Sequence, residues 1–256
     1  MVARQRFETS MHTPRRAATH PLHNQLLAAL GESGPAELAR WRPHLEFVEL
    51  SLGQVLGESG VTPDYAYFPT TAIVSLVYLT LDGASAEIAV VGHDGVVGIS
   101  LFMGGTATPN RAVVQSAGHG YRLRAQAVKD EALCAGPVLK VLLRYTQALI
   151  GQVAQTAACN RYHSIDQLLC RRLLLGLDRL PSSQIAMTQE SASNLLGVRR
   201  EGVTAAARRL QDDGVIRYSR GHISVLDRER LEARTCEFHA NTAPADRRPL
   251  PEPVIA

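Results

Sequence analysis

The stretch TQESASNLLGVRREGVTAAARRLQDDGVIRYSRGHISV, residues 188–225, decides the fold. Thr188 is a good N-cap for a short helix, and Glu190 follows in the first turn, where the helix dipole favours a negative charge. Gly197 then marks a turn a few residues later. This pattern predicts the first helix and the turn of a helix-turn-helix.

A second helix is predicted to begin at Arg199 or Arg200 and to end before Gly214, because "DDG" is a typical helix stop. Its inner face is apolar and consists of Val203, Ala206 or Ala207, and Leu210. Its opposite face carries Arg200, Thr204 and Arg208. Residues 215–225 then read as a two-stranded hairpin, so the whole stretch predicts a winged helix-turn-helix.

Six arginines and no lysine lie between Arg199 and Arg220. The planar guanidinium can bind phosphates and guanine edges with two donors at once, which an ammonium cannot do. Three acidic residues accompany them between residues 198 and 221, so this stretch has a net charge of +3, the same as the whole chain. An ordinary charged helical hairpin does not explain why a cap, a turn glycine, a buried valine and a wing occur in this order.

The sequence therefore predicts a DNA-binding surface. Arg200 is assigned to guanine, Glu201 to a cytosine amine, and the later arginines to phosphates, which position the protein without specifying bases. The predicted DNA-binding residues are Thr188, Gln189, Arg199, Arg200, Glu201, Thr204, Arg208, Arg209, Arg217 and Arg220.

Composition limits the other functions that the chain can have. Of its 256 residues, 45% are hydrophobic and 20% charged, which is ordinary for a globular protein. The four cysteines form no C-x-x-C pair, so zinc-ribbon and iron–sulfur spacings are absent, and we expect reduced thiols, no metal and no cofactor. No apolar run has the length of a membrane span, and no signal peptide is recognisable, so we expect a cytoplasmic protein without a membrane partner.

The part of the chain before residue 137 has a different pattern of apolar residues. Residues 22–42 show helical spacing, and short β-rich runs closed by glycine or proline follow from residue 47 to residue 125. These runs are 47–50, 65–68, 73–81, 87–91, 96–102, 111–115 and 121–125. Many short strands at this spacing predict an antiparallel, jelly-roll-like β-roll.

A long helix is predicted after Pro137, and its larger side chains recur at steps of four and three. This seam predicts a homodimer, with the interface residues Val138, Leu142, Tyr145, Leu149 and Gln152. A buried helix of a monomer would show a similar stripe, and the pattern alone leaves that alternative open. A further amphipathic helix is predicted over 165–177.

The predicted fold class is α+β, with an N-terminal antiparallel β-roll, a long dimerisation helix and a C-terminal winged helix-turn-helix. The expected boundaries are a disordered leader at 1–20, the β-roll at 21–136, the dimerisation helix at 137–159, the DNA-binding domain at 160–239 and a flexible tail at 240–256.

From about Leu22 to Phe238 the chain resembles the Crp/Fnr family of transcription regulators. The residues that carry the resemblance are 188–216 with the wing, "YFP" at 67–69, and "VVGISLF…NRAVVQ" between 96 and 115. The resemblance implies a cyclic-nucleotide-binding-like β-roll, base contacts by Arg200 and Glu201, and a pseudo-palindromic operator. Two positions depart from the family pattern. Ala205 stands where the best-known members have a third base-contacting arginine, and Arg199 replaces the usual capping serine.

The resemblance also places an effector pocket at Gly98, Ile99, Arg111 and Ala112. Members that bind cyclic AMP have a glutamate after the glycine, and here the residue is Ile99. We therefore expect cyclic AMP to bind weakly or not at all, and the effector stays unknown. Arg111 either holds a different phosphorylated ligand or pairs with a nearby carboxylate.

Two other classes of function compete with a DNA-binding regulator. A cupin-like metal enzyme would need converging ligands, and the roll offers only His93, His119 and Glu87, so no catalytic residue is predicted. An interaction module would not need the arginine-lined helix. We therefore predict a homodimeric transcription regulator whose partners are double-stranded DNA, a second copy of the chain and RNA polymerase.

Overall fold

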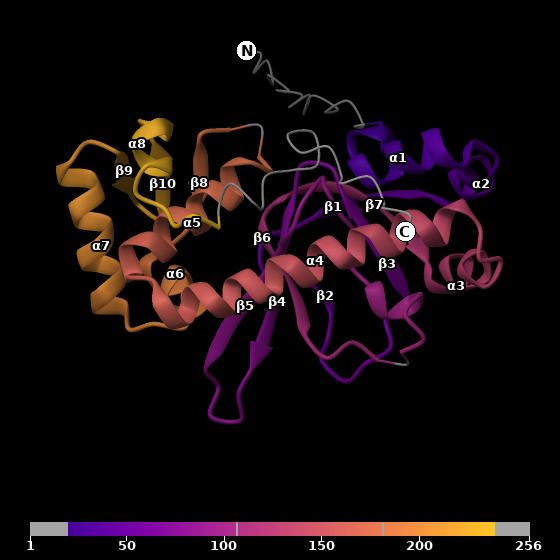
Figure 1. Ribbon diagram of the computed structural model, residues 1–256, viewed down its shortest axis with the longest axis horizontal. Helices are drawn as coiled ribbons and strands as arrows, with labels where there is room; N and C mark the ends of the chain where they lie inside the picture. The colour runs from indigo at the N-terminus through magenta and orange to yellow at the C-terminus, as the bar shows by residue number, and fades with distance from the viewer. Residues whose placement is uncertain (1–19, 106, 181, 239–256) are drawn as a thin grey trace, which may run out of the picture.

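The computed structural model describes residues 20–105, 107–180 and 182–238, and it divides into a β-roll, one long helix and a C-terminal helical module (Figure 1). This arrangement confirms the predicted α+β class. The expected leader, except for His20, and the expected tail lie outside the described residues.

The N-terminal helical region is divided into α1 (Gln25–Ser33) and α2 (Pro35–Trp41), because Gly34 and Pro35 interrupt it. Asn24 caps α1 by accepting hydrogen bonds from the backbone of the first turn. Its side-chain amide also donates to the carbonyl oxygens of Pro69 and Gly95, each at 2.9 Å. One buried side chain therefore both starts the helix and docks it on the roll.

Two antiparallel sheets form the roll. The first has the strand order β1 (Glu46–Leu50), β7 (Gly118–Arg124), β3 (Tyr65–Pro69). The second has the order β2 (Val55–Gly57), β6 (Arg111–Ser116), β4 (Ile73–Leu79), β5 (Ser85–Val91). Alternating apolar residues of both sheets point inward and make the core, as the short-strand pattern predicts.

The prediction of a strand over residues 96–102 is wrong. Gly98 has a φ of 106°, a left-handed conformation that ends extended pairing, and the short 3-10 helix Ile99–Leu101 follows it. Val97 alone pairs with Tyr67, through two backbone hydrogen bonds of 2.9 and 3.0 Å. The sequence analysis also missed β2 and the helix α3 (Ala125–Leu133).

The long helix α4 (Pro137–Tyr162) crosses the front of the roll and joins it to the C-terminal module (Figure 1). Proline in its first turn is as predicted. The five residues that the seam predicts as a dimer interface are buried or half-buried against the rest of the same chain. Val138 and Leu142 pack in the core with α1, and Leu149 packs in the apolar core of the roll.

Two polar members of that seam also contact the roll. The Tyr145 hydroxyl donates to the backbone carbonyl of Val96 at 3.1 Å. The side-chain carbonyl of Gln152 accepts from the backbone N–H of Val90 at 3.1 Å. An apolar stripe shows that a helix packs on something, and it does not show whether that surface belongs to the same chain. The alternative of a buried helix accounts for this stripe.

The C-terminal module contains all the elements that the opening stretch predicts. Its helices are α5 (Ile165–Leu177), α6 (Gln189–Leu196), α7 (Arg200–Asp212) and α8 (Arg228–Glu232). Its strands are β8 (Gln184–Ala186), β9 (Ile216–Ser219) and β10 (His222–Val225). The sheet order β8-β10-β9 adds a third strand to the hairpin that was predicted.

Among the described residues no single helix is long and apolar enough to cross a membrane. The pair α3 and α4, bent by 107° at the break between them, passes such a test together by length and composition only.

Candidate DNA-binding surface and effector pocket

Helix α6 begins where the cap predicts. The Thr188 hydroxyl accepts from the Ser191 backbone N–H at 2.9 Å, and the Ser191 hydroxyl oxygen accepts from the Thr188 N–H at 2.9 Å. This reciprocal pair is a capping box, with serine where glutamate is usual. Gly197 ends the helix with a φ of 65°, a left-handed turn that favours glycine.

Helix α7 packs by the face that its periodicity predicts, because Val203, Ala206, Ala207 and Leu210 are all buried. The sequence analysis missed Gly202. A Cβ atom there would lie 2.5 Å from Cδ1 of Ile165, so any other residue would require the end of the Ile165 side chain to move. The Thr204 hydroxyl donates to the Gln189 side chain at 2.8 Å and ties α7 to α6. These two predicted site residues therefore meet each other.

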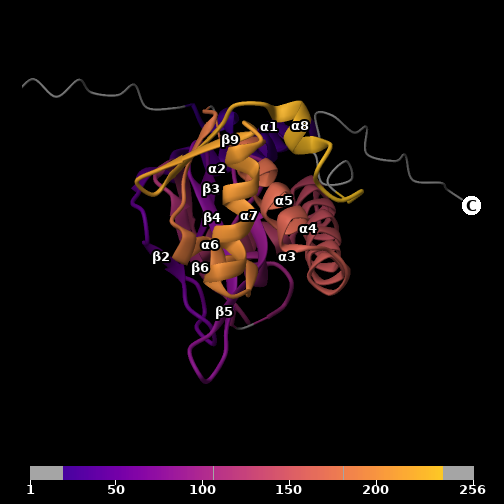
Figure 2. The ribbon, with the colours of Figure 1, turned by 90° about the vertical axis from the view of Figure 1, so that its left-hand side faces the viewer.

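The outer face of α7 is open to solvent. Arg199, Arg200, Glu201 and Arg208 are exposed, and α7 is turned towards the viewer in Figure 2. Within the described part of the chain, no hydrogen bond or ion pair engages the side chains of Arg199, Arg200 or Glu201. Arg208 has a loose contact of 3.7 Å with the exposed Asp212. Arg199 occupies the N-cap position without a side-chain cap, as its departure from serine predicts.

The wing places two more arginines beside α6. Arg220 and Gly221 form the turn between β9 and β10, with φ values of 48° and 80°. The carbonyl of Gly221 accepts from the backbone N–H of Met187 at 2.8 Å, which holds the wing against the start of α6. Arg217 and Arg220 are exposed. The turn of the wing therefore lies against the start of α6, and its two exposed arginines add to the positive charge of the module's surface.

Arg209 has a different environment from the other predicted contacts. Its guanidinium donates to both carboxylate oxygens of Asp166 on α5, at 2.8 and 3.1 Å. This hydrogen-bonded pairing raises the pKa of Arg209 above its ordinary value. In this structure Arg209 therefore contacts α5, and we leave it out of the proposed phosphate contacts.

Gly98, Ile99 and Ala112 of the expected effector pocket lie together in the roll. They line a cavity of about 20 Å³ together with Tyr65, Leu76 and Asn110. A single water needs about 10–15 Å³ of such space, so the cavity holds about one water and is far too small for a nucleotide.

Arg111, the fourth predicted residue, does not line this cavity. Its Nε atom lies 3.2 Å from a carboxylate oxygen of Glu58, and both side chains are partly exposed. A pairing with a nearby carboxylate was one of the two roles expected for Arg111, and it is the one present in this structure.

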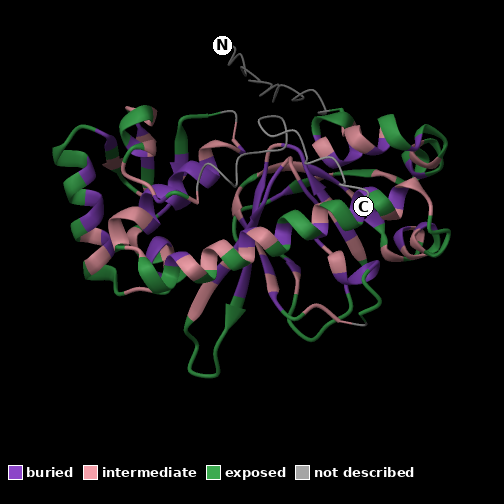
Figure 3. Ribbon diagram, in the orientation of Figure 1, coloured by how far each residue is buried: buried purple, intermediate pink, exposed green. Residues whose placement is uncertain are grey.

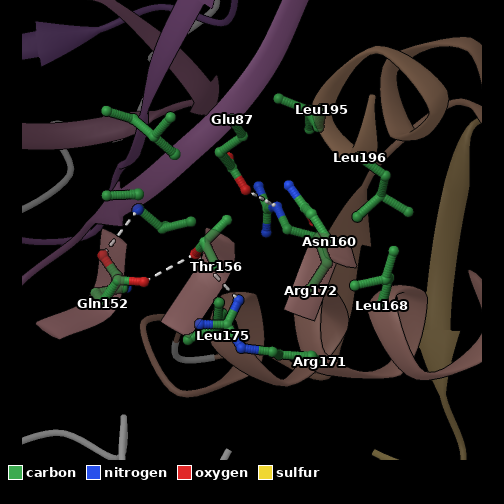
Figure 4. A pocket seen from close by; sticks show the side chains of 13 residues that line it. Glu87, Gln152, Thr156, Asn160, Leu168, Arg171, Arg172, Leu175, Leu195 and Leu196 are labelled. Atoms are coloured by element: carbon green, nitrogen blue, oxygen red, sulfur yellow. Dashed lines mark hydrogen bonds and ion pairs between the residues drawn. The ribbon is translucent and has the colours of Figure 1, made fainter. Parts of the chain in front are cut away.

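A buried ion pair joins the roll to the C-terminal module (Figure 4). Nε of Arg172 on α5 lies 2.6 Å from Oε1 of Glu87 on β5, with both side chains less than a tenth exposed. The Ser75 hydroxyl also donates to Glu87. A second pair, Arg179 with Asp94, bridges the two parts with a shortest N–O distance of 2.6 Å. The DNA-binding module is thus held by charged contacts as well as by α4.

The ligands that a cupin-like site would need do not converge. Glu87 is paired with Arg172, and the His119 ring stacks on Phe47 with centroids 5.3 Å apart. In the described residues, the one group of three or more metal-ligating side chains is Cys159, His163 and Cys236, outside the roll. The sequence analysis did not bring these residues together.

Comparisons with known proteins agree with this geometry. Residues 168–234 match the Crp-like helix-turn-helix domain family, and this range contains the whole α5–α8 module except its first three residues. No curated protein sequence is similar enough to this chain to match it.

Several solved structures have a similar fold. A transcriptional regulator of the Crp/Fnr family from Eubacterium rectale has a TM-score of 0.65 at 17% identity, over 82% of this chain and 98% of its own. FixK2 from Bradyrhizobium japonicum has a TM-score of 0.62 at 17% identity, over 75% and 98%. A CRP/FNR-family regulator from Thermus thermophilus has a TM-score of 0.60 at 21% identity, over 73% and 97%. The matched domain is a Crp-like helix-turn-helix, and the Eubacterium rectale and Thermus thermophilus structures are those of transcription regulators.

Proposed function

We propose that this chain, which has a Crp-like helix-turn-helix domain on the fold of the Crp/Fnr-family regulators, is a homodimeric, sequence-specific DNA-binding transcription regulator that does not depend on cyclic AMP. The observation that carries the proposal is the exposed face of α7. Arg199, Arg200 and Glu201 lie there without partners among the described residues, at the end of the helix that meets base edges in this motif.

The position of each residue on this surface indicates which part of the DNA it would contact. Arg200 can place two donors on guanine O6 and N7, and Glu201 can accept from a cytosine amine. Arg199, Arg208, Arg217 and Arg220 are exposed around them and would bind phosphates, which fix the register of the protein on the duplex. Gln189 and Thr204 are hydrogen-bonded to each other, so they would act mainly by fixing the angle between α6 and α7.

The homodimer is proposed through the solvent-exposed face of α4. Leu143 and Ile150 are 46% and 60% exposed there. Ala154 and Ala157 continue the same face at helical steps of four and three and are also exposed. Green patches along α4 in Figure 3 mark the exposed residues of this helix. A second α4 packed against it would bury these apolar groups and bring two α7 helices to one duplex.

Independence from cyclic AMP is supported by the roll. The cavity at Gly98 and Ile99 has room for about one water, and Arg111 is paired with Glu58. A ribose hydroxyl would also meet the apolar Ile99 side chain where a carboxylate is needed, and an unpaired buried hydroxyl costs about 1–3 kcal/mol. RNA polymerase is the further partner through which a regulator of this kind would act.

Genomic footprinting of the tagged protein tests the proposal. We expect discrete protected sites that share an inverted-repeat sequence and lie near transcription starts. Protection spread evenly over the genome, or no protection at all, would contradict it and would favour an interaction module.

A further inference from the structure

We propose that Cys159, His163 and Cys236 form a binding site for a thiophilic divalent metal ion such as Zn²⁺, at the joint between α4 and the DNA-binding module. One ligand atom from each of these side chains lies within 4.8 Å of the other two. Two thiols and one imidazole are a donor set that suits Zn²⁺, with a fourth position left for water or another ligand.

The distance between the two sulfurs fits a shared metal ion. The Sγ atoms of Cys159 and Cys236 are 3.5 Å apart. Two sulfurs on one tetrahedral Zn²⁺ lie about 3.8 Å apart, since each Zn–S bond is about 2.3 Å long. A disulfide would need about 2.05 Å. Small side-chain movements would therefore complete a metal site.

The two ring nitrogens of His163 have different environments. Its Nδ1 atom is buried and has no hydrogen-bond partner among the described residues. Its other nitrogen, Nε2, lies 3.4 Å from a carboxylate oxygen of Glu237. Metal-bound histidines commonly donate their second N–H to a carboxylate, which fixes the tautomer and the ring orientation. The orphaned Nδ1 is the atom that we assign to the metal.

The surroundings exclude water and supply positive charge. Cys159, Cys236 and Leu168 form a small buried apolar cluster. The guanidinium of Arg171 is near enough to Cys159 to interact with it electrostatically. Nε and Nη2 of Arg171 are buried and lack hydrogen-bond partners in the described residues. A metal ion would displace the thiol protons and leave the sulfurs as thiolates near this guanidinium.

The site spans two parts of the molecule that a regulator would move relative to each other. Cys159 and His163 are one helical turn apart at the end of α4, and His163 has the extended backbone that ends this helix. Cys236 follows α8, at the far end of the DNA-binding module. A bound ion would tie the C-terminal segment to α4 and restrict rotation between α4 and α5.

Metal content of the full-length protein tests the proposal. The protein is purified under reducing conditions, stripped with a chelator, loaded with Zn²⁺ or Co²⁺ and desalted. We expect about one ion per chain, and thiolate-to-cobalt charge-transfer absorption with Co²⁺. Cys159→Ser and Cys236→Ser should abolish that absorption, and Glu237→Gln should weaken Co²⁺ affinity about 10–100-fold while keeping all three ligands.

Cys170→Ser is the matched control, because Cys170 is also buried but lies outside the group. It should bind Co²⁺ as the parent protein does. Circular dichroism identifies a variant that fails to fold, and His163→Gln then provides a milder ligand loss. Three results would overturn the site. The parent protein retains no ion, or Co²⁺ absorption survives in Cys159→Ser. The third is that Cys159 and Cys236 form a disulfide and the protein still binds no metal after that disulfide has been reduced.

Discussion

At the scale of single residues, the exposed arginines divide into those with a partner in the protein and those without one. Arg200 has none among the described residues, whereas Arg209 is bidentate with Asp166. Arg200→Ala should therefore cost about 1–3 kcal/mol of binding at one base position and relax the preference there. Arg209→Ala should leave sequence preference unchanged and alter stability only slightly, because an exposed ion pair is screened by solvent. Fluorescence anisotropy with matched and mismatched duplexes measures the DNA binding of both variants. An equal loss of base preference in the two variants would contradict the assignment.

The wing residue Arg220 needs a different substitution, because its φ of 48° strains most side chains. Asparagine tolerates this conformation, so Arg220→Asn removes the charge while keeping the turn. We expect binding to weaken to a similar extent on all duplexes, with the slope of log K against log salt reduced by about 1. A loss confined to one operator sequence would instead mean that Arg220 reads a base.

The cysteines differ in exposure, and their reactivity should follow it. Burial raises the pKa of Cys170 to about 12, so almost no thiolate is present at neutral pH. Cys134 is exposed. In folded protein, iodoacetamide should therefore label Cys134 first and Cys170 only after unfolding, which peptide mass spectrometry detects. Rapid labelling of Cys170 would show that α5 opens easily.

At the scale of elements, α4 shows both what a sequence pattern can predict and where it stops. Its start and its stripe were predicted correctly, because proline placement and helical periodicity are local properties, whereas it ends at Tyr162 instead of residue 159. Periodicity does not identify the surface on which a stripe packs, and here Leu142 and Leu149 pack on the same chain. The exposed face with Leu143 and Ile150 has fewer large apolar residues and gave a weaker signal.

The prediction for dimerisation concerns this exposed face of α4. Leu143→Glu or Ile150→Glu should weaken the dimer by at least about 2 kcal/mol, because each places a charge in the proposed interface. Leu81→Glu is the control, since Leu81 is fully exposed at the β4–β5 turn, away from α4. Light scattering at several concentrations distinguishes these outcomes. An unchanged dimer in both α4 variants would move the interface elsewhere.

At the scale of the whole molecule, the buried Glu87–Arg172 pair holds the DNA-binding module on the roll. Glu87→Gln leaves the Arg172 charge buried without its counter-ion, which should lower the free energy of unfolding by about 3 kcal/mol. Glu87→Gln with Arg172→Met should recover much of this loss. Glu58→Gln, in the exposed pair with Arg111, should cost at most about 1 kcal/mol. Denaturant unfolding that ranks Glu58→Gln as more damaging than Glu87→Gln would contradict the structure.

Contacts between residues that lie far apart in the sequence also could not be predicted from it. The opening stretch predicted cap, turn, recognition helix and wing from residues close in the chain, and the structure confirms these elements. Glu87 with Arg172, and Cys236 with Cys159, are joined only by the fold. The spacing of Cys159 and His163 on one helix was a readable signal for two metal ligands, but the third ligand was not visible in it.

Selection of bound duplexes from a random pool tests the central claim most directly, because it reports base preference and symmetry together. The parent protein should enrich an inverted repeat whose half-sites are about one helical turn apart, roughly 34 Å. Arg200→Ala should relax the same guanine-containing position in both half-sites. Enrichment of a single unpaired site, or an inverted repeat that Arg200→Ala leaves unchanged, would contradict the claim that two α7 helices read the operator.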